Sequence, residues 1–150
     1  MVEQLDELYR AVILDHFKCS RYSGDLPDAQ IHTMGANPLC GDEVTFHVKL
    51  DQERIAQVRF TSKGCAISQA ASSMLAQQLE GRTLQEVGQI ITTMKALMQG
   101  QEPDPSIDLG DLEALAGVRK FPVRVKCAAL SWNVVEQGLA EYQRNSQSGG

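Results

Sequence analysis

The stretch EVTFHVKLDQERIAQVRFTS, residues 43–62, decides the fold. Its first eight residues alternate between polar side chains and the apolar side chains of Val44, Phe46, Val48 and Leu50. Alternation with a period of two residues is typical of a half-buried β-strand. The polar turn at 51–53 interrupts the pattern, which resumes over 54–62 with Ala56, Val58 and Phe60 on one side. The sequence therefore predicts an antiparallel hairpin.

Helical periodicity replaces the alternation on both sides of this hairpin. Apolar residues recur every three or four positions over 66–79 and over 84–98, and Thr83 and Glu86 have the spacing of a capping box. The same criterion predicts helices over 2–17, at 111–116 and from about 122 to 142. Residues 18–37 and 101–110 lack such a stripe and predict loops, the first with a short extended piece near Ile31.

Length, composition and charge narrow the kinds of protein that this chain can be. A chain of 150 residues, 43% of them hydrophobic, can bury one core, so we expect a single domain over 1–144 and a flexible tail over 145–150. A net charge of −5 disfavours nucleic-acid binding. An acidic start and the lack of an 18-residue apolar run predict a cytoplasmic protein that does not enter membranes. In that reducing compartment, cysteines serve as thiols or metal ligands rather than as disulfides.

Three cysteines stand in reactive contexts: NPLCGD ending at Asp42, KGCAIS around Cys65, and RVKCA around Cys127. Cys40 and Cys65 flank the two outer ends of the predicted hairpin, and these ends lie side by side if the strands pair in simple register. Three thiolates and the carboxylate of Asp42 suffice for a tetrahedral site around a thiophilic metal such as zinc. The predicted ligand set is Cys40, Asp42, Cys65 and Cys127.

Local structure also predicts that two of these thiols are activated. Cys65 and Cys127 fall at or near predicted helix starts, where unpaired amides favour a thiolate. A zinc ion with this ligand set carries a formal charge of about −2, which Arg124 and Lys126 are placed to balance. Cys19 has no acid or glycine beside it and is interpreted as a bystander.

The histidines are interpreted as structural. His16 and His32 are expected to form hydrogen bonds near a helix end and in a loop. His47 belongs to the outward-facing set of its strand, with Thr45 and Lys49, and is expected to be solvated.

With these motifs in hand, the chain resembles the U-type iron–sulfur cluster assembly proteins, the family of IscU, SufU and the N-terminal domain of NifU. The similarity covers the opening helix, the three cysteine contexts, and the segments ASSM at 71–74 and ALSW at 129–132. IscU-type relatives have a histidine before the third cysteine, where this chain has Lys126, and the segment from 110 to 121 is added. Both departures point to the zinc-binding SufU branch.

The resemblance implies a fold and a site. The fold is α+β, with a small, mostly antiparallel three-stranded sheet packed against several helices, and the third strand is expected between Ile31 and Cys40. Zinc is held by Cys40, Asp42, Cys65 and Cys127, and Cys40 takes persulfide sulfur from a SufS-type cysteine desulfurase. Arg124 matches a family position that steadies the site, and downstream iron–sulfur assembly proteins are further partners.

Three functions fit these residues. The first is a zinc-dependent sulfurtransferase in iron–sulfur cluster assembly. The second is a scaffold that builds a [2Fe–2S] cluster on Cys40, Cys65 and Cys127 with Asp42 and transfers it. The third is a structural zinc site in a protein that acts as a docking adaptor. Metal analysis of protein purified without reconstitution separates zinc from a cluster.

Overall fold

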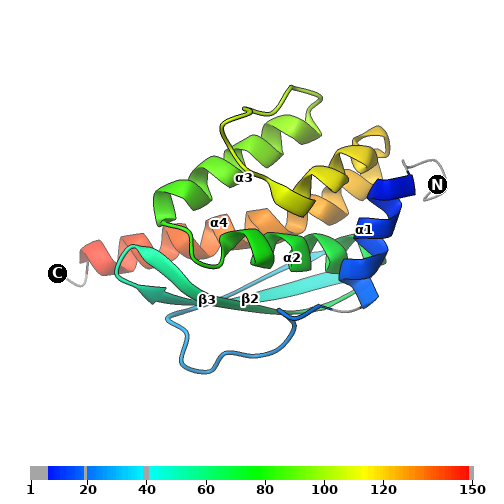
Figure 1. The fold of residues 1–150 in the computed structure, drawn as a ribbon. Coiled ribbons are helices and arrows are strands. Elements are labelled where there is room, and N and C mark those ends of the chain that lie inside the picture. Colours follow the sequence, from blue (N-terminus) through cyan, green and yellow to red (C-terminus); the bar gives the residue numbers. More distant parts are fainter. Residues whose placement is uncertain (1–6, 19, 39–40, 149–150) are drawn as a thin grey trace.

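The computed structural model describes residues 7–18, 20–38 and 41–148. The elements in chain order are α1 (Glu7–Lys18), β1 (Ile31–Asn37), β2 (Asp42–Asp51), β3 (Arg54–Lys63), α2 (Ala66–Leu79), α3 (Leu84–Met98), the 3₁₀ helix η2 (Gly110–Lys120) and α4 (Pro122–Ser148). In these described ranges the strands form one antiparallel sheet in the order β1-β2-β3. The helices cover one face of that sheet, while the segment between α1 and β1 crosses the other face (Figure 1). The predicted α+β architecture is confirmed.

The predicted hairpin forms β2 and β3. Their pairing runs from Glu43 opposite Lys63 to Asp51 opposite Arg54, so Gln52 and Glu53 alone make the turn. Gln52 has a φ of 58°, a left-handed value that hairpin turns of two residues require. The inward-facing apolar side chains of β2 are buried, as the alternation predicts: Val44, Phe46, Val48 and Leu50.

Strand β1 lies in the segment that the periodicity predicts to be a loop with a short extended piece near Ile31, and the strand continues beyond that piece to Asn37. The strand pairs with β2 from Ile31 opposite Val48 to Asn37 opposite Asp42, which confirms the strand implied by the family resemblance. Its inward positions are occupied by Ile31, Thr33 and Gly35, of which only the first is a large apolar residue. The alternation is therefore too weak to be recognised in the sequence.

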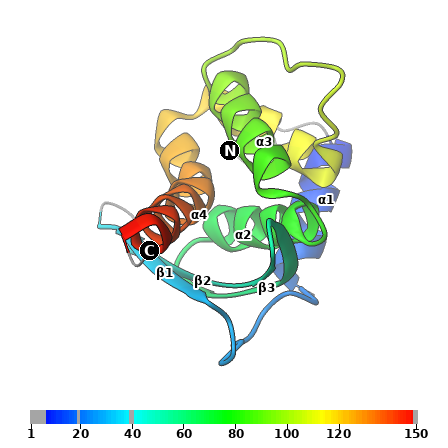
Figure 2. The same ribbon diagram turned by 90° about the vertical axis from the view of Figure 1, so that its left-hand side faces the viewer.

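The helices are stacked in two layers over the sheet. Helices α2 and α4 lie directly on it, and α3 lies farther away (Figure 2). The largest buried side chains of this core come from every layer: Phe46, Met74, Ile91, Leu115 and Trp132.

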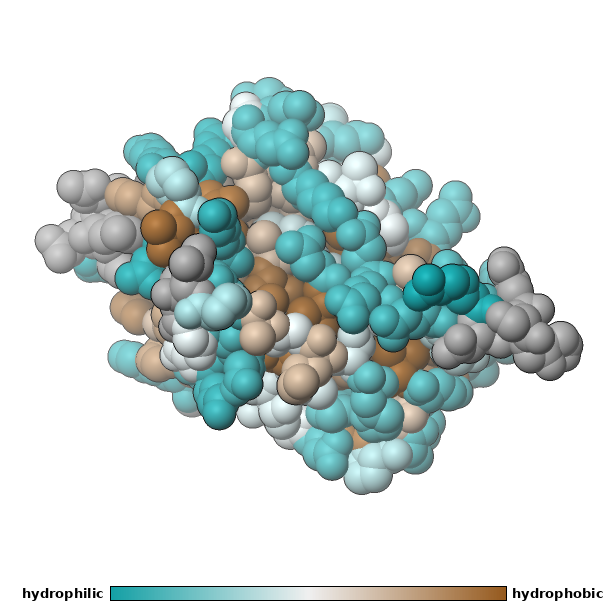
Figure 3. Space-filling view, turned by 180° about the vertical axis from the view of Figure 1, so that it is seen from behind, coloured by the Kyte–Doolittle hydropathy of each residue, from teal (hydrophilic) through white to brown (hydrophobic). Residues whose placement is uncertain are grey.

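Seen from behind, apolar surface is exposed in the centre of the face between hydrophilic side chains (Figure 3). An ion pair of 2.6 Å between Lys95 and Glu136 links α3 to α4.

Most of the helix boundaries agree closely with those predicted from the sequence. Thr83 and Glu86 form the predicted capping box at the start of α3. The short helix predicted at 111–116 is part of η2, and the described part of the helix predicted over 2–17 is α1, which ends one residue later at Lys18. Helix α4 continues to Ser148, so residues 145–148 of the segment predicted to be a tail are helical.

His16 ties α1 to the rest of the helical layer. Its Nδ1 lies 2.8 Å from Oγ of Ser73 in α2, and its Nε2 lies 2.8 Å from Oδ2 of Asp111 in η2. The prediction that His16 is a structural hydrogen-bonding residue is confirmed. None of the helices in the described residues has the length and apolar character needed to span a membrane.

Gly138 allows α4 to approach β1 closely, which gives a first test of the packing. A Cβ at this position would lie 2.6 Å from Cγ2 of Thr33, so we expect Gly138→Ala to lower the free energy of unfolding by about 1–3 kcal/mol. Gly88 in α3 is the matched control, because a Cβ there has no neighbour within 4 Å. Gly88→Ala should raise stability by about 1 kcal/mol through helix propensity. Urea denaturation measures both, and stabilisation by both substitutions would contradict the close packing.

Candidate metal centre

Three of the four predicted ligands converge at one end of the sheet. One ligand atom each from Asp42, Cys65 and Cys127 lies within 4.8 Å of the other two, in the part of the chain that the structure describes. Asp42 begins β2, Cys65 stands between β3 and α2, and Cys127 belongs to α4. Residues separated by up to 85 positions in the chain (127 minus 42) therefore meet. The antiparallel register explains the first part of this convergence, because it places the start of β2 beside the end of β3.

Asp42 and Cys65 are joined by hydrogen bonds. The backbone N–H of Cys65 donates to Oδ1 of Asp42 at 2.8 Å, and Sγ of Cys65 lies 3.7 Å from Oδ2. Cys65 is the N-cap residue of α2, and its Sγ accepts from the backbone N–H of Ser68 at 3.4 Å. An amide donating to sulfur at a helix N-terminus stabilises the thiolate form. The predicted position of Cys65 at a helix start is thus confirmed.

Cys127 occupies a different position from the one predicted. Helix α4 begins at Pro122, so Cys127 is its sixth residue and lies beyond the first turn. The prediction that Cys127 lies in the first turn of this helix is therefore wrong. Cys127 is completely buried, whereas Cys65 is partly exposed. Of these two thiols, only Cys65 is open to a reaction partner without movement of the chain.

Gly64 makes the contact between Asp42 and Cys65 possible. It has a φ of 127°, a conformation that residues with a side chain rarely adopt. A Cβ at this position would lie 2.7 Å from Cα of Asp42 and would collide with its carboxylate. The glycine thus brings the end of β3 against the start of β2 and leaves the carboxylate beside the next residue.

The donor set suits a divalent metal ion. Asp42 is completely buried, and none of the described Lys, Arg and His side chains forms an ion pair with it. A buried carboxylate without a cation is costly, and a dication beside two thiols removes that cost. Oγ of Ser68, in the first turn of α2, is also buried without a hydrogen-bond partner among the described residues. Thiolate and carboxylate ligands together are typical of zinc sites.

Comparison with known proteins identifies the family. The family described as NifU-like N terminal domain matches residues 8–128. The chain belongs to this family. It is 45% identical over 137 residues to the zinc-dependent sulfurtransferase SufU of Bacillus subtilis, covering 91% of this chain and 92% of that protein. It is 36% identical over 138 residues to the iron–sulfur cluster assembly scaffold protein IscU of Streptococcus pyogenes, covering 92% and 86%.

Solved structures of family members have the same fold. A crystal structure of a SUF-system iron–sulfur cluster assembly scaffold protein from Fervidobacterium islandicum matches with a TM-score of 0.81 at 35% identity, over 85% of this chain and 93% of that chain. The N-terminal NifU-like protein of Brucella abortus matches with a TM-score of 0.83 over 93% and 96%, and at 23% identity this likeness shows the fold alone. The resemblance inferred from the cysteine motifs is therefore confirmed.

The structure gives less information on the other residues that the sequence predicts at or near this site. Cys40 and Cys19 lie outside the described residues. Gly41, which follows Cys40, leads directly into Asp42, with a φ of 69° and no neighbour within 4 Å of a Cβ built on it. Arg124 is half-buried and Lys126 is exposed, both in α4 before Cys127. Their role in balancing the charge of the centre stays a prediction.

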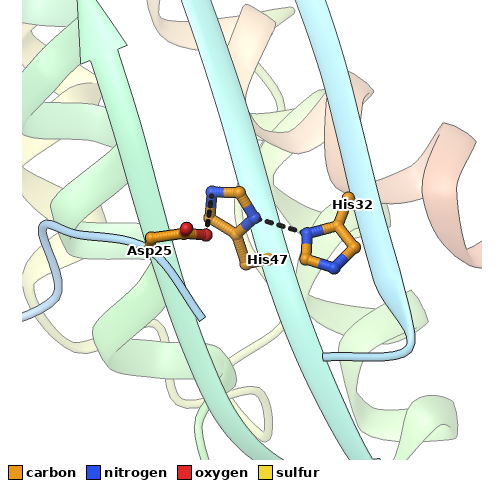
Figure 4. A group of neighbouring side chains, drawn as sticks. All are labelled: Asp25, His32 and His47. Carbon is orange, nitrogen blue, oxygen red and sulfur yellow. Dashed lines mark hydrogen bonds and ion pairs between the residues drawn. The ribbon is translucent and has the colours of Figure 1, made fainter. Parts of the chain in front are cut away.

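Sequence reasoning missed a second cluster of side chains of the types that can bind a metal ion, around His47. The residue is buried rather than solvated, with His32 on one side of its ring and Asp25, from the segment between α1 and β1, on the other. Its Nδ1 lies 2.7 Å from Nδ1 of His32, and its Nε2 lies 3.6 Å from Oδ1 of Asp25 (Figure 4). Burial lowers the pKa of His47 below the usual 6.5, with Asp25 acting in the opposite direction and His32 in the same one. The prediction that His47 is solvated is thus wrong. The sequence could not indicate its burial, because the pairing of His32 with His47 depends on strand β1, which cannot be recognised in the sequence.

Proposed function

We propose that this protein is a zinc-dependent sulfur acceptor of iron–sulfur cluster biogenesis, which takes persulfide sulfur from a SufS-type cysteine desulfurase. The observation that carries the proposal is the convergence of Asp42, Cys65 and Cys127 within 4.8 Å. Cys40 stands two residues before Asp42, and we assign it as the fourth ligand and, as the family resemblance implies, the sulfur acceptor. The relative from Bacillus subtilis, named as a zinc-dependent sulfurtransferase, supports the same assignment.

The residues of the centre have separate tasks in this proposal. Cys65, Cys127 and Asp42 hold zinc, which keeps its thiol ligands deprotonated and offsets the buried carboxylate. Arg124 and Lys126 balance the formal charge of about −2 left by three thiolates, one carboxylate and the zinc ion. Free thiols of this kind persist in a reducing compartment, so we place the protein in the cytoplasm.

The sulfur transfer itself is a thiol–persulfide exchange at Cys40. The Cys40 thiolate attacks the outer sulfur of the persulfide on the desulfurase, forming a new S–S bond, while the old S–S bond breaks and its electron pair stays on the desulfurase cysteine, which leaves as a thiolate. The outer sulfur ends as a persulfide on Cys40, and no external oxidant or reductant is consumed. Downstream iron–sulfur assembly proteins then receive this sulfur.

A [2Fe–2S] scaffold is the second candidate, because the same thiols are suitable ligands for a cluster. The Streptococcus pyogenes relative, named as a scaffold protein, supports it. Lys126 supports the first candidate instead, since the family resemblance implies a histidine at this position in scaffold-type relatives. Metal analysis of protein purified without reconstitution discriminates between them: about one zinc per chain is expected, and a brown chromophore that passes to an apo-ferredoxin would favour the scaffold. A purely structural zinc site is the third candidate.

Cys40→Ala tests the sulfur-acceptor role, with Cys19→Ala as the matched cysteine control. Each variant is incubated with cysteine and a SufS-type desulfurase, and persulfide on the chain is measured by mass spectrometry alongside sulfide release. We expect Cys40→Ala to lose the persulfide and the stimulation of the desulfurase, and Cys19→Ala to keep both. Unchanged stimulation by Cys40→Ala would exclude this role and leave the cluster scaffold and the structural zinc site as the remaining candidates.

A further inference from the structure

Two strands and a loop bring an acid and two histidines together on the outer face of the sheet, away from the helices. His32 in β1 and His47 in β2 are directly opposite each other in the register. Asp25 comes from the segment between α1 and β1, which crosses this face (Figure 1). One ligand atom from each of these residues lies within 4.8 Å of the other two. The cysteine centre uses none of them.

The backbone holds Asp25 in place. The N–H of Gly24 donates to the carbonyl of Phe60 at 2.8 Å, and the N–H of Phe60 donates to the carbonyl of Tyr22 at 2.9 Å, so the segment pairs with β3 immediately before Asp25. On the other side, the backbone N–H of Leu26 donates to Oδ1 of Asp25 at 2.7 Å. The carboxylate is therefore positioned by its own loop before any ligand arrives, which lowers the entropy cost of binding.

His47 lies between its two partners in the cluster. Nδ1 of His32 and Nδ1 of His47 are 2.7 Å apart, and Figure 4 shows the rings side by side with Asp25 on the far side of His47. The nearest cation on the neighbouring strand, Arg59, is already bound to Glu80 at 3.1 Å. A hydrogen-bonded pair of imidazoles beside a carboxylate offers the nitrogen and oxygen ligands that divalent transition metals bind.

We infer that Asp25, His32 and His47 form a second metal site, which binds a divalent cation with a preference for nitrogen and oxygen ligands, such as Zn²⁺. Three protein ligands leave one position of a tetrahedral ion for water. That position faces solvent, because His32 is exposed and the side chain of Asp25 is 67% exposed. The site is thus open and exchangeable, unlike the buried cysteine centre.

One side chain must turn for all three residues to bind the same ion. Asp25 lies at Nε2 of His47 and His32 lies at Nδ1, on different edges of that ring. A half-turn of the His47 ring about its Cβ–Cγ bond places Nε2 where Cε1 now lies, between the two partners. Zn–N bonds of about 2.0–2.1 Å then require the ligand atoms to lie about 3.3 Å apart.

The second site is independent of the cysteine centre. His47 lies five residues beyond Asp42 on β2, a distance of about 17 Å along an antiparallel strand. The two side chains also face opposite sides of the sheet, because the alternation places Asp42 with the inward set and His47 with the outward set. Loss of one site therefore leaves the other in place.

Zinc binding by the full chain tests the inference. Equilibrium dialysis against a series of buffered free zinc concentrations counts zinc per chain, with wild type compared with His32→Ala and Asp25→Asn. We expect wild type to bind one equivalent more than His32→Ala at intermediate zinc concentrations. Asp25→Asn should weaken that equivalent by about 10- to 100-fold. The same differences should persist in a Cys65→Ser, Cys127→Ser background, which separates them from the proposed function.

Asp28→Asn is the matched control, because Asp28 is another exposed acid of the same segment, paired with Lys49 at 2.8 Å on the same strand as His47. It should bind as much zinc as wild type. Nitrogen chemical shifts of the His32 and His47 rings should move only as the second equivalent binds. Equal zinc binding by wild type and His32→Ala, or equal losses for Asp25→Asn and Asp28→Asn, would overturn the inference.

Discussion

Asp42→Asn is expected to change zinc binding and stability in opposite directions. Asparagine has the shape of aspartate, and its Oδ1 still accepts the N–H of Cys65, now 2.8 Å from the carboxylate. The substitution removes the one carboxylate ligand of the proposed zinc site, so zinc affinity should fall by about 100-fold or more. In the metal-free chain it replaces a completely buried carboxyl group that has no cation partner among the described residues. The free energy of unfolding should therefore rise by about 1 kcal/mol.

Zinc competition with a chromogenic chelator measures the first effect, and urea denaturation of metal-free protein measures the second. Glu43→Gln is the matched control, because Glu43 adjoins Asp42 but its exposed carboxylate is paired with Lys63 at 2.9 Å. Glu43→Gln should change neither quantity by a comparable amount. If Asp42→Asn destabilises the metal-free chain and leaves zinc affinity unchanged, Asp42 has a structural role and is not a ligand.

The sequence predicts the parts of the fold whose side chains obey one period. The alternation over 43–62 locates β2, β3 and their turn, and the spacing of Thr83 and Glu86 locates the start of α3. Strand β1 escapes prediction because Thr33 and Gly35 occupy two of its inward positions. These residues are selected by contact with α4, which passes so close that a Cβ on Gly35 would lie 2.5 Å from Val134. A tertiary contact of this kind leaves no periodic pattern in the local sequence.

The candidate site likewise has a part that the sequence predicts and a part that it does not. Asp42 and Cys65 could be placed together because both belong to the ends of one hairpin, and pairing rules connect those ends. Cys127 could be assigned only by its motif, since nothing in the hairpin predicts where α4 lies. The second cluster depends on the register of β1, which alone places His32 opposite His47. A strand that cannot be recognised in the sequence therefore conceals the site built on it.

Gly64→Ala is expected to produce the largest loss of stability near the cysteine centre. Alanine at a φ of 127° is strained, and its Cβ would lie 2.7 Å from Cα of Asp42. Strain and collision together should lower the free energy of unfolding by about 2–5 kcal/mol. The collision also pushes the Asp42 carboxylate away from the amide of Cys65, so the variant should lose tightly bound zinc. Urea denaturation and zinc analysis after gel filtration measure the two losses.

Gly24→Ala separates the collision from the backbone strain. Gly24 has a φ of 137°, close to that of Gly64, but no atom lies within 4 Å of a Cβ built on it. The control should therefore lose only the strain energy, about 1–3 kcal/mol, and keep the zinc of the cysteine centre. The difference in stability between the two variants gives the energetic cost of the collision between the new methyl group at position 64 and Asp42. Equal losses of stability, with zinc retained by both, would mean that the chain relaxes around the new methyl group and that Gly64 does not position the carboxylate.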